Sequence, residues 1–95
     1  MKITFHIPGV LRDHTQGRSQ VEVNGSVETV AQALEQLWRV CPGLRDRVLT
    51  EQDELRQHLN IFVGEEHIRD HGGLLASVRA NESVTIVPAV SGGAT

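Results

Sequence analysis

The sequence of 95 residues contains one cysteine, no tyrosine and only three aromatic residues, one Trp and two Phe. A single cysteine excludes an intramolecular disulfide and is typical of a reducing compartment. Cys41 stands before Pro42-Gly43, at the end of a segment with helical apolar spacing. This position favours a buried thiol over a reactive nucleophile. The fold must therefore be held by a hydrophobic core, for which the chain has ample Val, Leu and Ile.

A basic excess is also absent. Nine Lys and Arg residues oppose 12 Asp and Glu residues, so the formal net charge is −3. Binding to nucleic acid requires a cluster of Lys and Arg that neutralises phosphates, and the sequence has none. Arg45, Arg47 and Arg56 are interleaved with acidic residues, which indicates a solvated mixed surface. We therefore expect no nucleic-acid partner.

Long apolar runs are missing too. No stretch of the sequence approaches the length that would span a membrane. The first eight residues are interrupted by polar side chains and by Pro8, too early for a signal peptide. We expect a soluble, cytoplasmic protein with no membrane partner.

The first half of the chain predicts two strands and one helix. Residues 2–7 and 20–23 alternate between apolar and polar side chains, as half-buried strands do, with a long loop between them. Apolar residues then recur at helical spacing over residues 30–41. Thr29 stands at the N-cap position, and Gln32 three residues later completes a capping-box pattern. Pro42-Gly43 ends the helix.

The second half predicts further strands. Residues 44–58 are charged and are expected to hold one short helical turn. Three strands are expected after it: residues 59–63, a short strand near 67–68, and a last strand over 84–87. This order predicts one α+β domain over residues 1–88, a mixed sheet of four to five strands packed on one main helix. The first and last strands can lie side by side in its centre. We expect residues 89–95 to form a flexible C-terminal tail that contains Gly-Gly.

Alternation along the strands also predicts two different sheet faces. If the inward side chains pack on the helix, then Phe62 and Val87 point to the other face, for which the sequence offers no second helix. They would form an apolar patch near the root of the tail, a candidate surface for partner docking. The alternative is that Phe62 tucks under the charged loop of residues 44–58.

Residues that often carry catalysis or metal binding form no site of their own here. His67 and His71 are four apart, but the segment has the pattern of a strand and a turn, and no third ligand accompanies them. We expect no metal. Gly72-Gly73 lacks the surrounding residues of a phosphate loop and indicates a turn. No serine has the context of a nucleophile, and no catalytic triad is recognisable.

Motifs over nearly the whole chain resemble those of the ubiquitin-like β-grasp sulfur carriers, the MoaD/ThiS-like family. Besides the helix, these motifs lie at residues 7–12, 59–63, 67–69, 73–74, 81–84 and 86–93. The pattern is most similar to the branch that feeds sulfur into cysteine biosynthesis, since Leu-Arg-x-His-Thr at residues 11–15 follows the first strand. A Gly-Gly pair alone is weak evidence for this family, but a pair that follows Val-Pro-Ala-Val-Ser is strong evidence for it.

The resemblance implies a ubiquitin-like fold and a protein that is a co-substrate, not an enzyme. It implies that an E1-like adenylyltransferase/sulfurtransferase uses ATP to adenylate the Gly93 carboxylate and convert it to a thiocarboxylate, while the carrier binds no cofactor itself. Val90, Ser91 and Gly92 would thread the partner's active site, where glycine offers no Cβ to obstruct it. A sulfur-accepting synthase, cysteine-synthase-like in this branch, would then take the sulfur.

The tail departs from the family pattern because Ala94 and Thr95 follow the glycines. We interpret the chain as a precursor cut between Gly93 and Ala94 by a JAMM-type zinc metalloprotease. A remnant of cloning and a divergent protein that no longer carries sulfur are the two rival explanations. Three other functions stay open: a ubiquitin-like modifier of lysines, a small subunit of a molybdopterin-synthase-like complex, and an interaction domain with a disordered tail. The sulfur-accepting metabolite also stays open.

Overall fold

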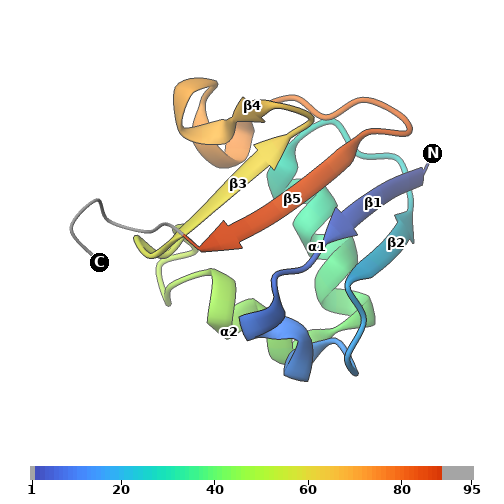
Figure 1. Cartoon of the computed structure of the whole chain (residues 1–95). Helices are drawn as coiled ribbons and strands as arrows, with labels where there is room; N and C mark the ends of the chain where they lie inside the picture. The colour runs from blue at the N-terminus through green and yellow to red at the C-terminus, as the bar shows by residue number, and fades with distance from the viewer. Residues whose placement is uncertain (1, 89–95) are drawn as a thin grey trace.

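Five strands form one mixed sheet in the computed structural model, which describes residues 2–88 (Figure 1). The strands are β1 (Lys2–His6), β2 (Gln20–Asn24), β3 (Leu59–Val63), β4 (Glu66–His67) and β5 (Ser83–Pro88). Their order in the sheet is β2-β1-β5-β3-β4, with β1 and β5 parallel and the other neighbours antiparallel. The α+β fold and the central pairing of the first and last strands are therefore confirmed.

Helix α1 (Val30–Val40) begins and ends at the signals in the sequence. Thr29 is the N-cap, and its Oγ1 accepts a hydrogen bond of 3.3 Å from the backbone N–H of Gln32. In return, the Gln32 side chain accepts one of 2.7 Å from the backbone N–H of Glu28, one residue earlier than in the usual capping box. The helix stops before Pro42-Gly43, as predicted. No helix in residues 2–88 is long and apolar enough to cross a membrane.

The long connection between β1 and β2 is tightly folded. It contains the 3₁₀ helix η1 (Gly9–His14), which buries Leu11. Thr15 is fully buried, and its hydroxyl donates to the carbonyl oxygen of Arg18 at 2.8 Å, with the Arg12 carbonyl oxygen 3.2 Å away. These bonds satisfy the one buried polar side chain recorded for residues 2–88.

The segment after α1 packs against the core in spite of its charges. A 3₁₀ turn, η2 (Pro42–Leu44), leads into the one-turn helix α2 (Arg45–Val48), which agrees with the short turn predicted there. Leu44 and Val48 are both fully buried. The charged residues between them face solvent, so the one-turn helix hides its apolar side and exposes its polar side.

The connection from β4 to β5 consists of turns. β4 ends at His67, and the buried Ile68 opens the 3₁₀ helix η3 (Ile68–Asp70), so the short strand lies slightly earlier than expected. Gly72 and Gly73 follow at φ values of 99° and 64°, in the left-handed region that glycine adopts readily. They lead into η4 (Gly73–Leu75). The pair is therefore a structural turn, as the sequence predicts.

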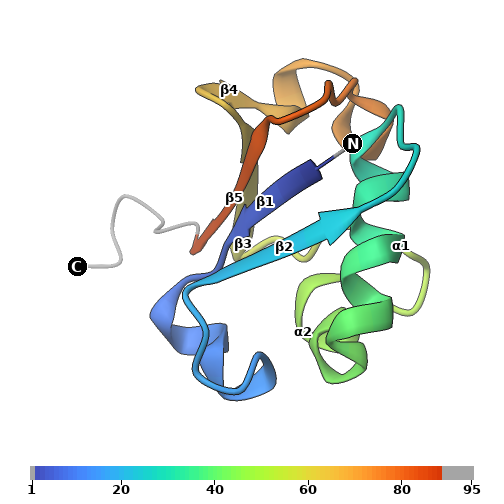
Figure 2. The same ribbon diagram turned by 90° about the vertical axis from the view of Figure 1, so that its right-hand side faces the viewer.

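The two faces of the sheet differ, and Figure 2 shows both α1 and α2 on the same side of it. The core lies between α1 and that covered face. Its largest fully buried side chains are Phe5, Ile3, Leu34, Leu37, Leu44, Leu59, Ile61, Ile68, Ile86, Val21, Val30 and Val48. In residues 2–88 no α-helix packs on the opposite face, and its outward side chains in the three central strands are only partly buried: Thr4, His6, Asn60, Phe62, Ser83, Thr85 and Val87.

Candidate functional site

β5 leads toward the predicted reactive end of the chain. It is the middle strand of the sheet, and its last residue, Pro88, pairs directly with Leu59 at the start of β3. Because β1 runs parallel to β5, the end of β1 lies at the same edge of the sheet. The predicted tail and processing residues lie outside the described residues: Val90, Ser91, Gly92, Gly93 and Ala94. The surroundings of the end of β5 are therefore the part of the site that can be described.

Phe62 and Val87 lie on the uncovered face of the sheet, as alternation predicts. In the β3–β5 register Asn60 is opposite Val87 and Phe62 is opposite Thr85. The two apolar residues are thus diagonal neighbours across adjacent strands, a separation that large side chains can bridge. Both are partly buried. The structure brings the two candidate docking residues together next to the end of β5.

The ring of Phe62 contacts the ring of His67, its partner across the β3–β4 pair. The ring centroids are 4.9 Å apart and the planes meet at 65°, an edge-to-face arrangement. His67 therefore covers one side of the Phe62 ring. Neither of the two arrangements expected for Phe62, the open apolar patch and the position under the charged loop, included this contact. The rest of the Phe62 ring stays on the uncovered face.

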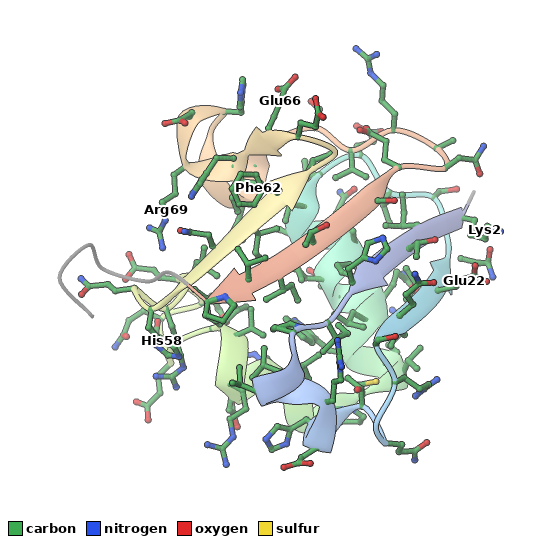
Figure 3. All side chains as sticks on the ribbon, viewed as in Figure 1. Lys2, Glu22, His58, Phe62, Glu66 and Arg69 are labelled. Carbon is green, nitrogen blue, oxygen red and sulfur yellow. The ribbon has the colours of Figure 1, made fainter. Side chains whose placement is uncertain are left out.

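Arg69 is a residue of this region to which the sequence analysis assigned no role. Its Nη2 donates to the carbonyl oxygens of Leu59 at 3.0 Å and Arg56 at 3.4 Å. Its Nε donates to Oδ1 of Asn60 at 3.3 Å. These bonds tie η3 to the start of β3, beside Phe62 (Figure 3). Nothing in the local pattern around Arg69 signals acceptors ten residues earlier in the chain.

The two histidines considered as metal ligands make other polar contacts. His67 Nδ1 accepts a hydrogen bond of 3.1 Å from the backbone N–H of Arg69. His71 Nε2 lies 3.0 Å from Glu66 Oε2. Within residues 2–88 no group of three or more His, Cys, Asp or Glu side chains could hold a metal ion.

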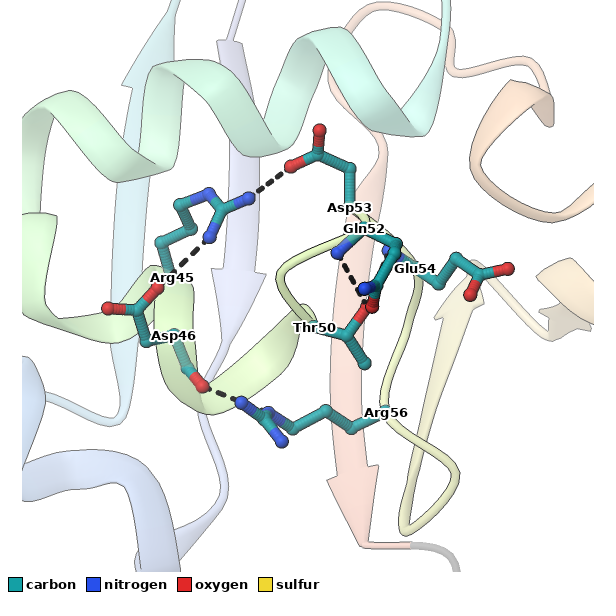
Figure 4. Close-up of polar contacts among 7 residues, drawn as sticks. All are labelled: Arg45, Asp46, Thr50, Gln52, Asp53, Glu54 and Arg56. Atoms are coloured by element: carbon teal, nitrogen blue, oxygen red, sulfur yellow. Dashed lines mark hydrogen bonds and ion pairs between the residues drawn. The ribbon is translucent and has the colours of Figure 1, made fainter.

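Charged residues in the 45–56 segment neutralise one another on the surface (Figure 4). Arg45 forms ion pairs with Asp53 and Asp46, and hydrogen bonds to those two carboxylates raise the pKa of Arg45 above its ordinary value. Arg56 Nε donates to the carbonyl oxygen of Asp46 at 2.9 Å. The Thr50 hydroxyl oxygen accepts from the backbone N–H groups of residues 52 and 54. This agrees with the predicted mixed surface.

The comparisons with known proteins agree with this architecture. The model of the ThiS family matches residues 5–93. A sulfur carrier protein, CysO of Mycobacterium tuberculosis, is 35% identical over 95 residues, with 98% of this chain and 100% of the relative covered. The crystal structure of the BexX/CysO complex of Amycolatopsis orientalis contains a chain 36% identical to this one. That match has a TM-score of 0.84 and covers 96% of this chain and 99% of the other.

A third similar protein is the small archaeal modifier protein 1 of Methanosarcina acetivorans, with 26% identity and a TM-score of 0.78. The alignment covers 97% of this chain and 96% of that protein. The fold in all these matches is the β-grasp. The chain therefore belongs to the ThiS family. It is a small sulfur carrier protein, a co-substrate of partner enzymes and not a catalyst.

Proposed function

We propose that the carboxylate of Gly93 is the group that carries sulfur. The observation that carries the proposal is the extent of the family match, which ends at residue 93, the second glycine of Gly92-Gly93. The described strand before this segment, β5, is the middle strand of the five-stranded sheet. Val90, Ser91 and Gly92 form the slim arm that enters the partner enzyme, and the domain stays outside.

The chemistry requires activation because a carboxylate is ionised at neutral pH and is a poor electrophile. An E1-like enzyme transfers AMP from ATP to the carboxylate, and pyrophosphate leaves. Hydrosulfide then attacks the acyl carbon: a C–S bond forms, the C–O bond to AMP breaks, and a thiocarboxylate remains. The residues of the carrier supply no acid or base to these steps, and ATP binds to the enzyme.

Ala94 and Thr95 hold the Gly93 carbonyl in a peptide bond, so a hydrolysis must come first. We assign it to a JAMM-type metalloprotease, which adds water between Gly93 and Ala94 and frees the carboxylate. The sulfur acceptor that we assign is a cysteine-synthase-like enzyme. The similarity to the CysO carriers supports this assignment. The BexX/CysO complex supports the idea that a carrier of this fold binds directly to the protein that it serves.

Intact-mass measurement tests the proposal. The form that ends at Gly93 is incubated with ATP, sulfide and an activating enzyme that is active on a carrier already known to it. We expect a mass gain equal to the difference between one sulfur and one oxygen atom. The full-length chain should gain nothing until the metalloprotease is added. An unchanged mass of the Gly93-ending form, with the known carrier converted alongside, would overturn the proposal.

A second candidate is conjugation of Gly93 to lysines of other proteins. The similarity to small archaeal modifier protein 1 favours it. Both functions share the adenylation step, so the products must separate them. After tryptic digestion of cell extracts, lysines that carry residues 80–93 as a branched remnant would establish the modifier, provided that the remnant is lost when the Gly93 codon is deleted. Their absence together with thiocarboxylate formation would leave the sulfur carrier alone.

A further inference from the structure

Arg69 has a fixed orientation although it is exposed to solvent. Three oxygen acceptors hold its guanidinium, those of Leu59, Arg56 and Asn60. Asn60 points to the uncovered face and is opposite Val87, so its bond to Arg69 Nε places the guanidinium at the rim of that face. In residues 2–88 the Nη1 atom of Arg69 has no hydrogen-bond partner. Its two N–H donors are oriented in advance and still free to bind.

Arg69 also forms no ion pair within the described part of the chain, although Asp53 and Glu54 line the same surface pocket. None of the four recorded ion pairs includes it, and Asp70, next in sequence, makes none with it. On the three central strands the outward side chains past Lys2 carry no fixed charge, since they are the Thr, Ser, Asn, His, Phe and Val residues named above. Lys2 is paired with Glu22 at the far edge of the sheet. Arg69 is thus a cation close to Phe62 that has no ion-pair partner in residues 2–88.

We infer that Arg69 is the electrostatic contact of the docking surface, and that it binds a carboxylate of the activating enzyme beside an apolar pocket for Phe62. This inference rests on the proposed function, which assigns the adenylation of Gly93 to that enzyme. A guanidinium matches a carboxylate in shape and charge, and one already held in place loses little rotamer entropy when it binds. An acidic partner group is expected because Arg69 is a cation that no ion pair of residues 2–88 engages.

Kinetics of adenylation at several salt concentrations test the inference. Pyrophosphate release is measured with the Gly93-ending form of the wild type and of Arg69→Gln, Arg69→Lys and Arg39→Gln. Arg39 is the matched control, an exposed arginine in the last turn of α1, on the helical side of the sheet. We expect Arg69→Gln to raise KM about tenfold at low salt with kcat unchanged. Arg69→Lys keeps the charge and should recover part of the loss.

Salt dependence separates a contact with the enzyme from a structural role. Ions screen the charge pair, so the wild-type KM should rise with salt, whereas the KM of Arg69→Gln should rise much less. A merely structural role would raise KM equally at every salt concentration and leave that slope intact, which would overturn the inference. It would also be overturned if Arg39→Gln matched Arg69→Gln, or if Arg69→Gln impaired only transfer to the sulfur acceptor.

The outcomes also distinguish this inference from the proposed function. Normal adenylation of both the wild type and Arg69→Gln, with the same salt dependence, would overturn the role of Arg69 alone. No adenylation of the wild type, with a known carrier converted alongside, would overturn both. The melting temperature of each variant identifies any loss of fold, and Arg69→Lys then supplies the comparison, because its charge remains while its fork of donors is lost.

Discussion

The ring of His67 packs edge-on against the ring of Phe62, with the centroids 4.9 Å apart. The two residues are direct partners in the β3–β4 pair, so the backbone register fixes the contact. His67 also accepts the backbone N–H of Arg69, which caps η3. One histidine therefore holds both an apolar and a cationic residue at the rim of the uncovered face, and this arrangement motivates the first prediction.

Phe62→Ala and Val87→Ala should weaken docking to the activating enzyme. Truncation of an anchor at an interface removes its buried contacts, and we expect KM for adenylation to rise by about tenfold for Phe62→Ala and less for Val87→Ala. The kcat at saturation should not change if the two side chains act in binding alone. Steady-state kinetics with the Gly93-ending form measure both. Thr4→Ala, on the same face but on β1, is the control, and an equal effect there would contradict the docking role.

Bulky side chains in the tail should block the reaction without affecting the domain. Gly92→Val with Gly93→Val places branched side chains where the partner's channel must close on backbone, and we expect thiocarboxylate formation to fall by about two orders of magnitude. Intact mass after a fixed incubation gives the yield. Ser91→Ala should react normally. A double valine variant that forms product at the wild-type rate would refute the reactive role of the glycine pair.

Thr15→Val should destabilise the fold although it keeps the shape of the side chain. The hydroxyl of Thr15 is buried and bonded to the Arg18 carbonyl oxygen, so its removal leaves that acceptor without its partner. We expect a loss of about 1–3 kcal/mol in the free energy of unfolding. Urea denaturation followed by circular dichroism measures it. Thr15→Ser keeps the hydroxyl and should lose less. If the serine variant were the less stable one, packing of the methyl group and not the hydrogen bond would dominate.

Leu44→Ala and Arg45→Gln, which are adjacent, should differ sharply in their effects. Leu44 is fully buried, and its truncation should cost about 2–5 kcal/mol in the free energy of unfolding. Arg45 pairs with Asp46 and Asp53 in solvent, where such pairs contribute little, so Arg45→Gln should remain close to the wild type. Because pairing raises the pKa of Arg45, its stabilising effect is fully present at pH values below the ordinary guanidinium pKa. The effect is lost only when the pH rises through the raised pKa. Its contribution should therefore be constant through the neutral range, which denaturation at several pH values would check.

Local patterns were sufficient wherever the physical cause is local. Thr29 and Pro42-Gly43 mark the limits of α1 because a cap and a helix breaker act within one turn. Strict alternation separates the buried Ile61 and Ile86 from the outward Phe62 and Val87, since side chains on a strand alternate between faces. The change of period from strands to helix and back also determined the fold class.

Other features arise only when distant segments meet, and no local pattern encodes them. Arg69 reaches carbonyl oxygens ten and thirteen residues back because η3 folds against the start of β3. Thr15 is buried because the connection between β1 and β2 closes over it, and Ile68 turns inward where β4 ends. The sequence by itself determined the element types, the cap residues and the two faces of the sheet. Only the tertiary structure decided which cation and which aromatic ring lie near Phe62, because strand register and chain packing bring those side chains together.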